Sequence, residues 1–460
     1  MKKPSVQLRD SATMRWLMLL LVSLTMFAAY VASDVFSPLQ TMLKDHNLWN
    51  ASEYGLFSGA YSIFNVFLGM LIFGGLILDR KGIRFSGLLS CLLMIVGIAI
   101  KYWAVTNNAL INSSMVIFGS EYKMQVVWAV VGYGTFGVGA EVAGVTVSKT
   151  VVKWFKGKEL ALAMGMQLSL ARLGSAAALA FSPMIATKFG NVSTPVLFGL
   201  VLLVLGGLSF AIYTIYDKKL DKQIKADELE PEESFNVKDV KAILNNKGFW
   251  LIAILCVVFY SAVFPFLKYA AGLMEYKFGV SRELSGLIPS MLPFGAIVLT
   301  PLFGIIYDKI GRGADLMIGG AVLLTSVHVM FALPFINQWW MAIVLMLLLG
   351  IAFSMVPSAM WPSLAKIIPE RQLGTTYALT FYIQNIGLMI VPILIGNLLN
   401  TQAVANDLVS EVAVVYDYTL PMIIFAGICS IAIVVSIILK RTDKKMGYGL
   451  QFANIEKKPK

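Results

Sequence analysis

The chain has 460 residues, of which 58% are hydrophobic and 14% are charged. Soluble globular proteins carry roughly 25% charged and 45–50% apolar residues, so this composition excludes a soluble domain over most of the chain. The formal net charge is +11, but the basic residues fall on alternate loops, which excludes a nucleic-acid-binding surface. We expect a multi-pass membrane protein in a lipid bilayer, with no cofactor, no metal site and no nucleic-acid partner.

Twelve apolar segments are long enough to cross a bilayer, since a crossing needs about 20 apolar residues. They are 15–43, 53–78, 84–106, 124–152, 159–187, 193–216, 248–275, 283–306, 314–335, 338–365, 371–400 and 416–440. The polar segment 217–247 ends in an amphipathic pattern that predicts a short helix on the membrane surface. The sequence therefore predicts an all-α membrane protein with twelve transmembrane helices in two six-helix bundles, 1–216 and 248–460, joined by a cytoplasmic linker.

Lys and Arg concentrate in one set of alternate loops, which includes the segments 80–84, 153–158 and 309–312. The opposite loops carry a mixed and partly acidic set of side chains. The positive-inside rule places the basic loops and both termini in the cytoplasm. Because the loops are compact and no sorting signal precedes the first span, we expect the inner membrane of a bacterial cell.

One short loop motif recurs at equivalent places in the two halves. Gly75-Leu-Ile-Leu-Asp79-Arg80-Lys-Gly82-Ile-Arg84 follows the second segment, and Gly304-Ile-Ile-Tyr-Asp308-Lys-Ile-Gly311-Arg312 follows the eighth. Glycine permits a tight turn and close helix packing, and the charged side chains can reach neighbouring helices. We expect five gating residues that close the cytoplasmic side in one state: Asp79, Arg80, Arg84, Asp308 and Arg312.

The repeated loop resembles the signature of the major facilitator superfamily over nearly the whole chain, which implies two bundles that rock about a central cavity. Three further stretches are similar to the lysosomal dipeptide transporters of animals and their bacterial relatives. They are Trp154-Phe-Lys-Gly-Lys-Glu-Leu with Gln167-Leu-Ser-Leu-Ala-Arg172-Leu-Gly-Ser, Ala262-Val-Phe-Pro-Phe266 with Glu275-Tyr-Lys-Phe-Gly279, and Trp361-Pro with Gln372-Leu-Gly-Thr and Gln384-Asn385-Ile-Gly-Leu. The resemblance implies that Glu141 and Arg172 bind the charged termini of a dipeptide, although the glycine pair before the family's Glu is Gly139-Ala140 here.

Glu141 and Arg172 lie deep within the fourth and fifth apolar segments. At a rise of about 1.5 Å per residue, both are about 15–20 Å from the basic loop that joins these segments, near the middle of the bilayer. Charged groups at this depth are costly and are usually functional. Arginine binds a carboxylate with two donors and glutamate can bind an ammonium, so the two residues suit a zwitterion. The alternative interpretation is an ion pair that fixes the two helices together.

Several weaker candidates accompany this pair. Asp34 has a functional and a structural interpretation. In the first, it binds the ammonium or acts at an outer gate; in the second, it caps a helix that breaks at Pro38. Aromatic and amide side chains expected near the cavity are Tyr61, Tyr260, Trp361, Gln384 and Asn385, which suit varied peptide side chains. We expect Lys101 and Lys268 to extend toward the outer membrane surface rather than bind substrate.

These features predict a monomeric secondary transporter that moves dipeptides by alternating access, as a facilitator without a coupled ion. The alternative is a proton-coupled carrier of amino acids or small organic anions, for which Arg172 alone suffices. A membrane sensor or scaffold is disfavoured because the chain shows no added signalling domain. An enzyme is not expected, since no phosphate-binding glycine loop and no catalytic triad or metal-ligand pattern is evident.

Overall fold

The computed structural model describes residues 7–117, 120–155, 158–223, 237–369, 372–407 and 416–453. Its N-terminal half comprises η1 (Leu8–Asp10), α1 (Ala12–Asp34), η2 (Ser37–Leu39), α2 (Gln40–Asn47), α3 (Ala51–Phe67), α4 (Met70–Thr106), η3 (Asn108–Leu110), β1 (Ser114–Ile117), β2 (Ser120–Lys123), α5 (Met124–Phe155), α6 (Leu160–Phe189) and α7 (Ser193–Asp221). After α8 (Val237–Leu244), the C-terminal half comprises α9 (Lys247–Tyr276), α10 (Leu287–Ile310), α11 (Gly313–Ala332), α12 (Trp339–Ile367), α13 (Leu373–Asp407) and α14 (Thr419–Met446).

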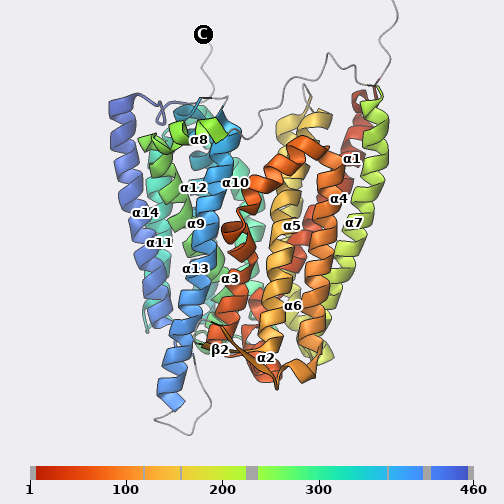
Figure 1. The fold of residues 1–460 in the computed structure, drawn as a ribbon. Coiled ribbons are helices and arrows are strands. Elements are labelled where there is room, and N and C mark those ends of the chain that lie inside the picture. The colour runs from red at the N-terminus through yellow and green to blue at the C-terminus, as the bar shows by residue number, and fades with distance from the viewer. Residues whose placement is uncertain are drawn as a thin grey trace, which may run out of the picture.

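The long helices stand side by side in two groups, with α1–α7 on one side of the molecule and α9–α14 on the other (Figure 1). Large apolar side chains such as Leu205 (55% exposed) and Val298 (69% exposed) lie on the outer surface of this array. Such a surface suits the hydrocarbon of a bilayer and not water. The expected all-α membrane fold is confirmed.

Eleven of the described helical segments are long and apolar enough to cross a membrane. The remaining expected segment, 53–78, is divided between α3, which has 17 residues, and the beginning of α4. Gly69 separates the two with φ of 59°, a left-handed conformation that glycine adopts without strain. A second such residue, Gly82 with φ of 78°, bends α4 between the second and third expected segments.

A two-stranded hairpin lies between α4 and α5, where the sequence analysis left a loop. Strands β1 and β2 are antiparallel, and Ser114 pairs with Lys123. The Lys123 Nζ lies 2.9 Å from a carboxylate oxygen of Glu53, which ties the hairpin to the start of α3. We call this end of the molecule, which also carries α2, the hairpin end. The opposite end, which carries α8, is called the linker end (Figure 1).

The two halves pack directly on each other through α3 with α13 and through α6 with α10. Glycines on α3 allow the first contact: a Cβ added to Gly55 would lie 2.7 Å from the Pro392 oxygen, and one added to Gly59 would lie 2.5 Å from the Met389 oxygen. Real Cβ atoms do not approach this closely, so both positions need glycine. Small residues at helix interfaces allow close backbone approach in membrane proteins.

Candidate substrate site

Glu141 lies on α5 on the same helix face as Tyr133 and Gly137, because the three are spaced four residues apart. A Cβ on Gly137 would lie 2.0 Å from the backbone carbonyl oxygen of Tyr61, so this glycine lets α3 approach α5. The Tyr61 hydroxyl then donates to Glu141 Oε1 at 3.0 Å. The Asn385 amide of α13 also lies beside this carboxylate. The structure thus brings three of the expected site residues together, from both halves of the molecule.

Arg172 lies on α6 and faces aromatic rings of the opposite half. Its guanidinium carbon is 5.7 Å from the centre of the Phe264 ring and 5.0 Å from that of Phe353. Guanidinium groups are attracted to aromatic faces at such distances. Among the described residues, no carboxylate forms an ion pair with Arg172, so its hydrogen-bond donors are available to a ligand.

The interpretation of Glu141 and Arg172 as an ion pair is not supported. Both side chains are described, and no contact within 4.0 Å joins them as an ion pair. Both are partly exposed although they lie in the middle of their helices. Tyr30 of α1 lies near both residues. Two opposite charges are therefore held apart in one partly accessible region.

Aromatic side chains of the C-terminal half form one wall of this region. Trp361 donates its indole N–H to the Tyr260 hydroxyl at 3.1 Å. The rings of Tyr260 and Phe264 are stacked, with centres 5.4 Å apart. The structure thus joins Tyr260 and Trp361, two of the candidate residues, to the rings that face Arg172.

The two amides of α13 differ in their surroundings. The Gln384 side chain is buried, and its Oε1 lies 3.5 Å from the Cys256 sulfur. Asn385 donates to the Phe381 carbonyl at 3.0 Å, while its Oδ1 is buried without a protein partner. Asn385 therefore presents its amide beside Glu141, whereas the Gln384 oxygen is directed toward α9.

Asp34 forms an ion pair across the two halves. Its Oδ1 lies 2.8 Å from Lys268 Nζ on α9, and its Oδ2 accepts from Ser175 of α6 at 2.5 Å. Lys268 also donates to the Ser37 hydroxyl at 3.0 Å. These contacts fit the gate interpretation of Asp34 better than the helix-cap interpretation, since the Ser37 hydroxyl lies as far as 3.5 Å from Asp34 Oδ1.

The expectation that Lys101 and Lys268 extend to the membrane surface is wrong. Lys268 is engaged by Asp34, and Lys101 is fully buried with its Nζ 4.2 Å from the centre of the Phe36 ring and 5.0 Å from that of Tyr133. The reason is that η2 packs on α9, the helix of Lys268, and that Phe36, just before η2, lies against the Lys101 amine. A lysine extends to the surface only where nothing covers its helix.

Three residues near the site were not singled out from the sequence, namely Ser175, Phe264 and Phe353. Helical spacing in the sequence could have indicated Ser175 and Phe264. Tyr260, Phe264 and Lys268 are spaced four residues apart on α9, and Ser175 follows Arg172 by three, so each set shares a helix face. Phe353 carries no such signal, because aromatic residues are common throughout the apolar segments.

The expected gating residues lie at the linker end. Arg84 contacts Asp217 at 3.0 Å and also Asp221, and Arg312 contacts Asp315 at 2.9 Å. These contacts of Arg84 and Arg312 stay within their own halves of the molecule. Arg80 is exposed and Asp308 is half-buried, while the Asp79 side chain lies outside the described part of the structure.

A sequence-family model described as Major Facilitator Superfamily matches residues 22–392 and 267–451. The chain belongs to the major facilitator superfamily. It is therefore a multi-pass membrane protein and a secondary transporter, and it is not an enzyme.

Curated relatives support a narrower grouping. The chain is 31% identical over 401 residues to the lysosomal dipeptide transporter MFSD1 of Homo sapiens, a match that covers 84% of this chain and 80% of that protein. MFSD1 of Mus musculus is 27% identical over 437 residues, which covers 93% of this chain and 86% of the mouse protein. The chain is thus related to MFSD1 over most of its length.

Solved structures share the same architecture at low sequence identity. A bacterial homolog of the human lysosomal transporter Spinster, in an inward-facing and occupied conformation, matches with a TM-score of 0.67 and 13% identity over 95% of this chain and 98% of that chain. A D-xylose-proton symporter matches with a TM-score of 0.66 and 15% identity over 92% of this chain and 97% of that chain. At these identities the matches show the fold alone.

Proposed function

We propose that this protein transports dipeptides, with Glu141 and Arg172 binding the two charged ends of the substrate. The observation that carries the proposal is that these opposite charges lie in the middle of α5 and α6 without pairing with each other. Partly accessible charges near the middle of a membrane are costly unless a ligand or partner compensates them. A zwitterion compensates both at once.

Arg172 binds the peptide carboxylate, because its guanidinium presents two parallel donors to the two oxygens. Glu141 binds the ammonium, and the Tyr61 hydroxyl at 3.0 Å from Glu141 Oε1 holds the carboxylate in place. The rings of Tyr260, Phe264 and Phe353 offer apolar area to peptide side chains of different shapes. The relatives named as dipeptide transporters support this assignment of substrate class.

The positions of the contacts between the halves support alternating access as the proposed mechanism. Among the described side chains, two ion pairs join the halves, Asp34 with Lys268 and Asp45 with Arg282, and both lie toward the hairpin end. The contacts of Arg84 and Arg312 at the linker end stay within one half each. We infer that this structure is closed at the hairpin end. In the state that is open there, the two ion pairs between the halves must break, and the gating residues must form contacts across the halves at the linker end.

By the positive-inside rule, the basic residues support a cytoplasmic location for the linker end and both termini. The proposed location is the inner membrane of a bacterial cell, and the proposed working unit is a monomer. No coupled ion is part of the proposal, so the protein equilibrates dipeptide across the membrane without concentrating it. A carrier of single amino acids or organic anions is the competing function.

The test is uptake of a radiolabelled dipeptide, such as alanyl-alanine, into vesicles that contain the purified protein. We expect counterflow of dipeptides in preference to free alanine or acetate, and no accumulation above equilibrium under an imposed pH gradient. Glu141→Gln and Arg172→Ala should each lower the signal by about a hundredfold. Glu283→Gln and Arg441→Ala, which remove the same charges at exposed positions, serve as matched controls. Transport of alanine or acetate at the dipeptide rate would contradict the substrate, and uphill accumulation would contradict the facilitator.

A further inference from the structure

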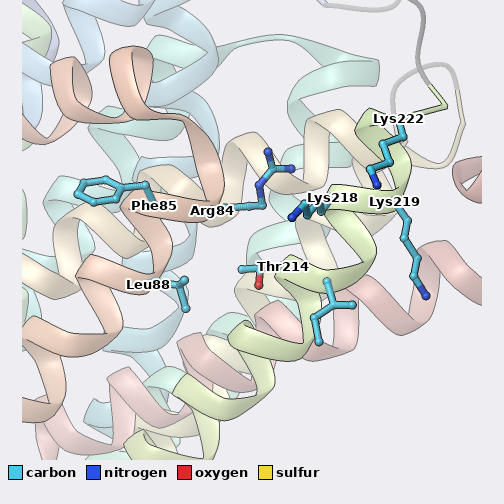
Figure 2. A pocket seen from close by; sticks show the side chains of 8 residues that line it. Arg84, Phe85, Leu88, Thr214, Lys218, Lys219 and Lys222 are labelled. Atoms are coloured by element: carbon cyan, nitrogen blue, oxygen red, sulfur yellow. The ribbon is translucent and has the colours of Figure 1, made fainter.

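A groove of about 520 Å³ lies on the outer surface of the N-terminal half at the linker end, between α4 and α7 (Figure 2). It is lined by four cationic residues, Arg84, Lys218, Lys219 and Lys222. It is also lined by apolar side chains that include Leu88 and Ile215. The groove is separate from the proposed substrate site, which lies between the halves.

The cations of the groove are not equivalent. Arg84 is compensated by Asp217 and Asp221, which also bind Lys153. Lys218, Lys219 and Lys222 are exposed, and in the described part of the chain no carboxylate forms an ion pair with any of the three. The described groove therefore carries an excess of positive charge that its own acidic residues do not neutralise.

The apolar part of the groove faces the membrane. Leu88 is 42% exposed and Ile215 is 57% exposed, so both present their side chains to the bilayer. The lysines lie in the last turn of α7 and just beyond it, where this membrane-spanning helix reaches the surface. Apolar side chains below and uncompensated lysines above match the two parts of a phospholipid, an acyl chain and an anionic headgroup.

We propose that this groove binds one anionic phospholipid. The headgroup phosphate lies among Lys218, Lys219 and Lys222, and an acyl chain lies along Leu88 and Ile215. The lysines supply charge-assisted hydrogen bonds to phosphate oxygens, which are stronger than bonds between neutral groups. The bound lipid bridges α4 and α7 and thereby stabilises the linker end of the N-terminal half.

The test measures lipid retention by native mass spectrometry on the full chain in detergent, with added phosphatidylglycerol as the probe. There are two comparison ligands. Phosphatidylcholine has acyl chains but no net charge on its headgroup, and glycerol 3-phosphate is anionic but has no acyl chain. We expect one phosphatidylglycerol to bind to the parent protein in preference to both. The triple variant Lys218→Gln/Lys219→Gln/Lys222→Gln should bind it about a hundredfold more weakly, since each lysine near the surface strengthens the attraction of anionic lipid about fivefold.

The matched control is Arg441→Gln/Lys444→Gln/Lys445→Gln, which removes three exposed positive charges from the linker end of α14. This control should keep the bound lipid. The single variant Leu88→Gln changes the apolar part alone and should also weaken retention without altering charge. Equal loss in both triple variants, equal binding of phosphatidylcholine, or full competition by glycerol 3-phosphate would overturn the proposal.

Discussion

Two pairs of opposite charges within the membrane segments behave differently. Asp34 and Lys268 are in direct contact at 2.8 Å, with two serine hydroxyls adding hydrogen bonds. Glu141 and Arg172 remain apart, each supported by aromatic side chains. In the first pair the two charges neutralise each other, whereas the second pair is complementary to a molecule that carries both charges.

The two pairs also differ in how they relate to the halves. Asp34 lies on α1 and Lys268 on α9, so movement of the halves must break this pair. Glu141 and Arg172 lie on α5 and α6 of the same half, so their spacing is independent of that movement. We infer that the substrate stays bound to the N-terminal half while the aromatic wall of the C-terminal half moves relative to it.

Arg172 gives the largest expected effect. Arg172→Ala should lower kcat/KM for a dipeptide by about a hundredfold or more, because a charge-assisted bidentate interaction with the carboxylate is lost. Arg172→Lys keeps the charge but not the two parallel donors and should recover part of the activity. Initial rates in proteoliposomes, at matched protein content, measure this. Full activity in Arg172→Ala would remove the residue from the binding site.

Lys268→Met should destabilise the protein by about 1–3 kcal/mol, since it leaves the partly buried Asp34 carboxylate without its cation. The double variant Asp34→Asn/Lys268→Met should recover most of this loss, because no unpaired charge remains. Thermal unfolding followed by fluorescence compares the three proteins. The account of this pair would be wrong if the double variant were less stable than Lys268→Met.

Tyr61→Phe removes the hydroxyl that donates to Glu141 and leaves the ring in place. Hydrogen bonds to charged groups contribute about 1.5–3 kcal/mol, so we expect a rise in KM of roughly tenfold and a loss of stability no larger than that contribution. Transport measured over a range of dipeptide concentrations tests this. Tyr382→Phe is the control, since its hydroxyl donates to the Val66 carbonyl away from Glu141. An unchanged KM in Tyr61→Phe would show that this bond does not position the carboxylate.

The smallest effect is expected from Lys101→Met. The Lys101 amine is buried without a hydrogen-bond partner, and the aromatic rings around it compensate that cost in part. Methionine of similar length should fill the same space and raise Tm by a few degrees. Lys188→Met, at an exposed position, is the control for a general effect of charge removal. A fall in Tm would mean that the amine is stabilised where it lies.

Much of the fold was predictable because hydropathy alone identifies apolar segments of spanning length. The separation of α3 from α4 at Gly69 was not predictable, because a single glycine in an apolar run does not reveal its backbone conformation. The paired strands Ser114–Ile117 and Ser120–Lys123 were also missed, since such short strands carry little periodicity. Depth in the membrane identified Glu141 and Arg172, and helical spacing could have added Ser175. The role of Lys268 depended on contacts with α1 and η2, which are far apart in sequence and need the folded structure.

The central claim is that Glu141 binds the ammonium and Arg172 the carboxylate of one dipeptide. Isothermal titration calorimetry can compare alanyl-alanine with its N-acetylated and C-amidated forms, in the parent protein and in Glu141→Gln and Arg172→Ala. We predict that N-acetylation weakens binding to the parent protein and to Arg172→Ala but has little further effect in Glu141→Gln. C-amidation should weaken binding to the parent protein and to Glu141→Gln but have little further effect in Arg172→Ala. If both modifications weaken binding equally in all three proteins, the two residues do not contact the two ends of the substrate.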